Sequence, residues 1–87
     1  MKTLHLILKG QWYDMIDRGE KKEEYRELTP YWMKRIGSEH TRVCFHKGYT
    51  STTMTFAIEG KSYGYGNPDW GAPADRKVLK IQLGERL

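Results

Sequence analysis

The sequence predicts an α+β domain, in which a small β-barrel or strongly curved sheet carries two short helices. Short segments with alternating apolar residues are separated by glycines, and two segments with apolar residues at helical spacing lie among them. The length of 87 residues suffices for one domain and not two, so we expect residues 1–87 to form a single domain. A sheet of short strands gains most by closing, because closure removes exposed edges.

The N-terminal segment predicts a strand followed by a short helix. Leucines alternate along residues 2–9 and share one face, which is typical of a strand with one buried side. Residues 11–18 then carry an apolar stripe at helical spacing, formed by Trp12, Met15 and Ile16. Gly19 is placed to end that helix in the left-handed conformation.

The next segment predicts a charged strand and a second helix. Residues 22–27 are almost all charged, so we expect this strand to line a wet surface or cleft rather than a core. Thr29 can cap a helix and Pro30 suits its first position. One face of this helix holds the apolar residues Trp32, Met33 and Ile36. Gly37 is expected to end it.

Three further strands complete the predicted sheet, at residues 41–47, 51–59 and 77–83. Turns are expected at residues 48–49 and 60–61, where glycine interrupts the alternating pattern. The stretch between the second turn and the last strand is expected to be irregular. The resulting order, β-α-β-α-β-β-loop-β, contains no repeat and no linker.

The composition permits a phosphate-bearing partner without requiring one. The chain has 15 Lys and Arg against 11 Asp and Glu, which gives a net charge of +4. Aromatic residues make up 13% of the chain. They provide either stacking surfaces for bases or large apolar groups for a small core.

The same composition favours a cytoplasmic protein. Cys44 is the only cysteine, so there is no disulfide framework, and a single cysteine fits a reducing compartment. The first nine residues are too short and too charged for a secretory signal. No apolar run approaches the roughly 20 residues that span a bilayer, so we expect no membrane partner.

The densest group of chemically active side chains lies at residues 19–26. In a strand, Glu24 and Arg26 point to the same side, and the long side chain of Lys21 can reach that face from the corner before it. A carboxylate held between two cations keeps its charge and fixes their positions. Two donors so placed suit a phosphate or a base edge. The alternative is a solvated, salt-bridged surface strand.

These residues resemble the signature of the ASCH domain family, a strand and an aromatic-bearing helix followed by Gly-x-Lys-x-x-Glu-x-Arg. The four fixed places are filled by Gly19, Lys21, Glu24 and Arg26. Trp12 and Ile16 match the helix, and residues 30–36 and 70–73 are similar to those of small bacterial and phage members, so the likeness covers nearly the whole chain. The resemblance implies a PUA-like β-barrel with a cleft beside its first helix, where family members are thought to bind RNA or act on nucleosides.

The resemblance also raises the question of catalysis. One branch of the family hydrolyses the amide of N4-acetylcytidine with a Lys-x-x-Thr pair and a later glutamate. Lys21 falls on that lysine, whereas Glu24 occupies the threonine place, and the later glutamate has no counterpart that we can place. A buried Lys21 could act as a general base with Glu24 as proton shuttle. Ribonuclease activity is attributed to some relatives and stays open.

The other candidates for chemistry are one cysteine and three histidines. Cys44 and His46 lie two residues apart in a predicted strand and point the same way, as a nucleophile and its base would. The alternative for Cys44 is simple packing. His5, His40 and His46 show no metal-ligand spacing, so we expect neither a metal site nor a cofactor.

The glycine-rich loop over residues 63–71 is a second candidate binding element. Glycine lets the backbone approach a ligand closely, and Tyr65 and Trp70 could stack on bases. The alternative for Trp70 is that it plugs one end of the small barrel. Lys9 follows the first strand and is expected near the mouth of the same cleft.

The function predicted from the sequence is binding of RNA or a nucleotide in a basic cleft. The cleft residues on this hypothesis are Lys9, Trp12, Lys21, Glu24, Arg26, Tyr65 and Trp70. The cations would contact phosphates or base edges, and the glutamate would accept a hydrogen bond from a base amine. One alternative is a small hydrolase acting on a modified nucleoside or on RNA, with Lys21 and Glu24 as catalytic candidates. The other is a protein-binding adaptor in which the motif is structural.

Overall fold

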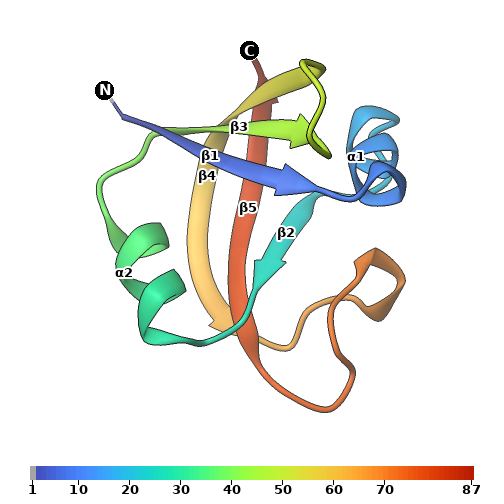
Figure 1. Cartoon of the computed structure of the whole chain (residues 1–87). Helices are drawn as coiled ribbons and strands as arrows, with labels where there is room; N and C mark the ends of the chain where they lie inside the picture. Colours follow the sequence, from blue (N-terminus) through green and yellow to red (C-terminus); the bar gives the residue numbers. More distant parts are fainter. Residues whose placement is uncertain (1) are drawn as a thin grey trace.

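The computed structural model describes residues 2–87 as five strands, two α-helices and one short 3₁₀ helix, in the predicted order (Figure 1). The elements are β1 (Thr3–Leu8), α1 (Gly10–Asp17), β2 (Glu23–Arg26), α2 (Pro30–Gly37), β3 (Arg42–Lys47), β4 (Thr53–Gly64), η1 (Pro68–Trp70) and β5 (Val78–Arg86). The prediction of an α+β fold with two short helices is confirmed. Among the described residues, no helix is long and apolar enough to cross a membrane.

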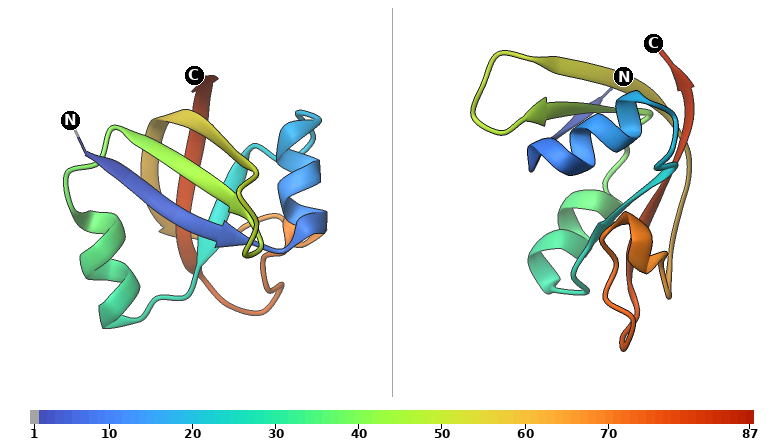
Figure 2. Two further views of the ribbon diagram at one scale, coloured as in Figure 1. Left: turned by 45° about the horizontal axis from the view of Figure 1, so that its top comes forward. Right: turned by 90° about the vertical axis from the view of Figure 1, so that its right-hand side faces the viewer.

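The five strands form one mixed sheet in the order β1-β3-β4-β5-β2. β1 pairs with β3 in parallel, and the other pairs are antiparallel. The sheet curls into a half-barrel, so that its two edge strands, β1 and β2, approach each other (Figure 2). The Arg26 side chain on β2 crosses this opening and donates to the Ile7 carbonyl on β1 at 3.1 Å. A guanidinium thus bridges the two edges of the half-barrel.

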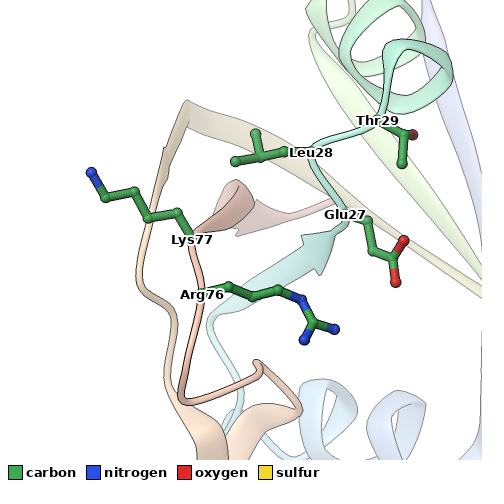
Figure 3. Close-up of a pocket in the computed structure, with 5 residues that line it drawn as sticks. All are labelled: Glu27, Leu28, Thr29, Arg76 and Lys77. Atoms are coloured by element: carbon green, nitrogen blue, oxygen red, sulfur yellow. The ribbon is translucent and has the colours of Figure 1, made fainter.

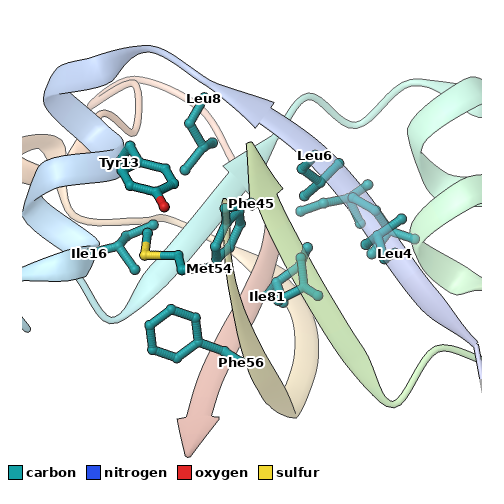
Figure 4. Close-up of a cluster of buried hydrophobic side chains, with 12 residues drawn as sticks. Leu4, Leu6, Leu8, Tyr13, Ile16, Phe45, Met54, Phe56 and Ile81 are labelled. Carbon is teal, nitrogen blue, oxygen red and sulfur yellow. The ribbon is translucent and has the colours of Figure 1, made fainter. Parts of the chain in front are cut away.

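The main core fills the concave side of the curled sheet (Figure 4). The alternating leucines of β1 point into it, as predicted, together with Val43 and Phe45 of β3. In α1 the buried residues are Tyr13 and Ile16, whereas Trp12 is only partly buried. Of the predicted stripe, Ile16 is buried as expected, whereas Tyr13 takes the place in the core that was expected for Trp12. Trp12 turns instead toward the loop after β4, as described below.

β4 is much longer than the sequence indicated. The turn expected at residues 60–61 is wrong, because β4 continues to Gly64 and pairs with β5 throughout that stretch. The pairing shifts register between Phe56 and Ile58 and again between Ile58 and Gly60. Such bulges bend a strand and increase its twist, and a glycine within a strand often marks one. The glycine that suggested a turn therefore lies where the long strand curves around the core.

A second, smaller cluster fixes the loop between β4 and β5. It contains Tyr25, Ala72 and Val78, with Trp70 packed against them. A Cβ atom at Gly66 would lie 2.6 Å from the Tyr25 ring, so this close approach requires glycine. The Tyr25 hydroxyl accepts a hydrogen bond from the Asn67 backbone N–H at 3.0 Å and donates to Glu23 at 2.9 Å. The loop is thereby attached to β2.

Candidate nucleic-acid interface

The three charged residues of the motif meet in one ion cluster. Gly19 ends α1 with a positive φ of 81°, and the chain then turns into β2. The Lys21 ammonium lies 3.1 Å from one Glu24 carboxylate oxygen, and Arg26 donates to the other. The sequence therefore predicted this grouping correctly. The expectation that residues 22–27 line a wet surface or cleft is wrong for Glu24, whose side chain is only 5% exposed, but it holds for Arg26 and Glu27, which line surface hollows. The Lys21 side chain, just before the strand, is 1% exposed.

Lys21 uses its donors within the protein. Besides Glu24, its ammonium bonds the backbone carbonyls of Glu23 and Trp70, both at 2.7 Å. An ammonium has three N–H donors, and these three acceptors account for them. The Trp70 contact ties the loop after β4 to the start of β2. Lys21 thus resembles a structural cross-link rather than a ligand contact.

Two aromatic rings complete the surroundings of Lys21. Its ammonium lies 4.5 Å from the centre of the Tyr25 ring and 5.8 Å from that of Trp12. Burial lowers the pKa of the Lys21 ammonium, and the neighbouring Glu24 carboxylate opposes that shift. The ammonium is buried but paired with a carboxylate and fully hydrogen-bonded, which is the condition under which proteins tolerate a buried lysine.

Arg26 occupies a different environment from Lys21. Its guanidinium bonds Glu24, the Tyr25 carbonyl and the Ile7 carbonyl, and it lies 5.1 Å from the centre of the Trp32 ring. Three of the five N–H donors of the guanidinium are engaged, which leaves two for a ligand. Its side chain is 18% exposed. Arg26 is the member of the ion cluster that can contact a ligand without rearrangement.

A second arginine also lies near the Trp32 ring. Arg35 of α2 lies 5.9 Å from the centre of that ring and donates to the His5 carbonyl at 2.7 Å and to the Tyr31 hydroxyl at 3.2 Å. Its buried Nε has no hydrogen-bond partner among the described residues. Arg35 and Arg26 thus satisfy carbonyls on the free edge of β1 while keeping donors to spare.

These arginines lie in a groove made of three adjoining hollows. The first, of about 410 Å³, lies between β1 and α2 and includes both arginines and Trp32. A middle hollow of about 190 Å³ shares Arg26 with the first and shares Glu27 and Arg76 with the third. We call these three hollows together the basic groove.

The third hollow, of about 370 Å³, lies where β2 ends and β5 begins (Figure 3). Glu27 and Arg76 point to the same side of it, whereas Lys77 extends away from them (Figure 3). The groove is therefore lined by several cations, with Glu27 as its one acidic lining residue. Such a lining suits a phosphate-bearing chain.

Four other predicted site residues lie outside the basic groove. Lys9 is exposed just before α1, and Tyr65 is 60% exposed on the loop, but neither lines any of the three hollows. Trp12 packs over Gly71, where a Cβ atom would lie 3.1 Å from its ring. Trp70 packs on the second cluster. The structure therefore separates these residues from Arg26.

Sequence reasoning missed two of the residues that line the groove with Arg26. Trp32 was assigned to the apolar face of its helix, and Arg76 received no role. The spacing of Trp32 and Arg35 places them on one side of α2, and this was the available signal. That spacing does not show that β1 forms the opposite wall of the hollow.

No protein-family model, no curated protein and no solved structure matches this chain.

Proposed function

We propose that this chain is an ASCH-type, PUA-like domain that binds single-stranded RNA or a nucleotide-like ligand in the basic groove. The observation that carries the proposal is the arrangement around Trp32. A partly exposed indole lies near two arginines, 5.1 and 5.9 Å from its ring centre, and both guanidiniums keep unused donors. Single-strand binding sites usually combine aromatic side chains, on which bases stack, with cationic side chains that contact phosphates.

The groove offers separate contacts for the two parts of a nucleotide. Arg26 and Arg35 can hold a phosphate in the fork geometry that guanidinium groups favour. The rings of Trp32 and Tyr31, which pack edge to face at 4.9 Å, offer aromatic surface for a base. Arg76 lies further along the groove, where it can meet the next phosphate. On this proposal the ligand lies along the groove and does not reach Lys21.

The test is a fluorescence-anisotropy titration with a short labelled single-stranded RNA at several salt concentrations. The logarithm of the binding constant should fall linearly with the logarithm of salt concentration, with a slope of about −0.7 for each phosphate contacted. Arg35→Gln should weaken binding about tenfold. Lys34→Gln is the matched control, because Lys34 is on the same helix, is exposed and lines none of the three hollows. Equal effects of the two variants would contradict binding in the groove.

The hydrolase alternative receives less support. It requires Lys21 and Glu24 to act on a substrate, yet both side chains are buried and form an ion pair with each other. The Lys21 ammonium also donates a hydrogen bond to the Trp70 carbonyl. We therefore propose binding without turnover. Incubation of the protein with N4-acetylcytidine, followed by NMR, checks this. Cytidine and acetate peaks that grow with time and vanish in Lys21→Met would overturn it.

A further inference from the structure

The convex face of the sheet carries a cluster that the basic groove does not explain. β1 and β3 run in parallel, and their register places His5 beside Cys44 and Ile7 beside His46. Cys44 and His46 are two residues apart on β3, so their side chains share one face, and His5 lies on that face of β1. One ring nitrogen of each histidine and the Sγ atom of Cys44 all lie within 4.8 Å of one another.

The distances within this cluster fit one metal ion. Nδ1 of His5 lies 3.0 Å from Nε2 of His46, and Sγ of Cys44 lies 3.8 Å from the same nitrogen. Tetrahedral zinc, with bonds of about 2.0–2.1 Å to nitrogen and about 2.3 Å to sulfur, separates two nitrogens by about 3.3 Å and a nitrogen from sulfur by about 3.6 Å. His5 and Cys44 lie within 4.8 Å of each other, and the His5 side chain, which would approach Cys44 when an ion binds, is exposed.

We propose that His5, Cys44 and His46 form a binding site for a divalent transition-metal ion, with Zn²⁺ as the best match. A thiolate and two imidazoles are ligands that Zn²⁺ commonly takes in proteins. The Cys44 thiol releases its proton to solvent when the metal binds, and the two histidines bind as neutral imidazoles. Three protein ligands leave a fourth position for water or another small ligand, as in open zinc sites.

The fold holds the ligands ready for the ion. Cys44 and His46 are fixed by pairing on both sides of β3, since Thr55 and Thr53 of β4 lie opposite them. Cys44 is buried, whereas the His5 ring lies at the exposed end of the cluster, which gives an ion a path to the site. Spacing along the sequence does not reveal this cluster, because the third ligand comes from a strand about 40 residues away, and only the parallel pairing of β1 with β3 brings it near.

The experiment is a Co²⁺ titration of the reduced, full-length chain without a polyhistidine tag. Co²⁺ takes up zinc-type sites, and a thiolate ligand gives it a charge-transfer absorption band. We expect this band to grow to one equivalent of Co²⁺ and to disappear when Zn²⁺ is added, because zinc binds such sites more tightly. No band, or a band that Zn²⁺ does not displace, would overturn the proposal.

Three variants and one control assign the ligands. Cys44→Ser should abolish the thiolate band, and His5→Gln and His46→Gln should each weaken Zn²⁺ binding by about tenfold or more. His40→Gln is the control, because His40 lies outside the cluster. His5 is exposed, so His5→Gln keeps the test decisive even if Cys44→Ser fails to fold. Unchanged Zn²⁺ affinity in His5→Gln would leave the 3.0 Å contact between the two imidazoles as a simple hydrogen bond.

Discussion

Lys21 and Arg26 bond the two oxygens of the same carboxylate, yet they belong to two regions of different character. In the buried ion cluster, Lys21 has no exposed donor and holds the loop after β4 through the Trp70 carbonyl. In the basic groove, Arg26 keeps two donors and lies near Trp32. The comparison teaches that two cations of one short motif can have separate roles, one in holding the fold and one in facing a ligand.

Position in the chain explains this difference. Lys21 lies at the corner between α1 and β2, where the loop after β4 folds over it. Arg26 is the last residue of β2, an edge strand, and faces the opening of the half-barrel. A side chain at such an edge can both bridge the opening and remain accessible. Substitutions on the two sides of Glu24 should therefore give different effects.

The largest effect is expected from Lys21→Met, which keeps the length of the side chain and removes its charge. Two buried carbonyls and one carboxylate oxygen then lose their donor, so the free energy of unfolding should fall by about 3–5 kcal/mol. That is a large part of the total for a domain of this size. Urea unfolding followed by circular dichroism measures it. Lys22→Met, at the exposed neighbouring position, should stay within about 0.5 kcal/mol of the wild type.

Arg26→Gln should affect both stability and binding. The loss of the bonds to Glu24 and the Ile7 carbonyl should lower the free energy of unfolding by about 2 kcal/mol, less than for Lys21→Met, because water can reach this site. RNA affinity should fall at least about tenfold. The same urea and anisotropy measurements test the two effects separately. Wild-type affinity in a folded Arg26→Gln variant would move the ligand away from the groove.

The fold was more accessible to sequence reasoning than the site. Alternating leucines, a Thr-Pro helix start and a glycine after α1 each act locally, so element order and most boundaries could be predicted. The exception at Gly60 arose because a bulge in a long strand and a turn have the same sequence signal. The groove and the His5–Cys44–His46 cluster depend on strand pairing between distant segments. A single sequence does not reveal that pairing.

Trp32→Leu should separate the groove from the glycine-rich loop. Removal of the indole takes away the proposed stacking surface, so RNA affinity should fall about tenfold, or by about 1.4 kcal/mol. Tyr65→Leu, on the exposed loop, should leave the affinity unchanged. Anisotropy titrations of both variants make the comparison. The opposite pattern would favour the loop as the binding surface, as the sequence first suggested.

The smallest effect is expected from Tyr25→Phe, which tests how the buried Tyr25 phenol contributes to stability and how that contribution depends on pH. Burial raises the pKa of the Tyr25 phenol from 10.0 to about 12, and its hydrogen bond to Glu23 adds to the shift, because a phenolate there would face a carboxylate. At neutral pH the variant should lose about 1 kcal/mol of unfolding free energy, the usual net value of such a hydrogen bond.

The pH dependence of this contribution has a definite sign. Because the pKa is higher in the folded than in the unfolded chain, folding favours the protonated phenol. The stabilisation is therefore complete below pH 10 and is lost as the pH rises from 10 to about 12. A spectrophotometric titration of the wild type should include a phenol that ionises near pH 12, and this step should be missing in Tyr25→Phe. If all the phenols of the wild type ionised together near pH 10, Tyr25 would be open to water, and the second cluster could not be the buried support on which the loop and the ion cluster rest.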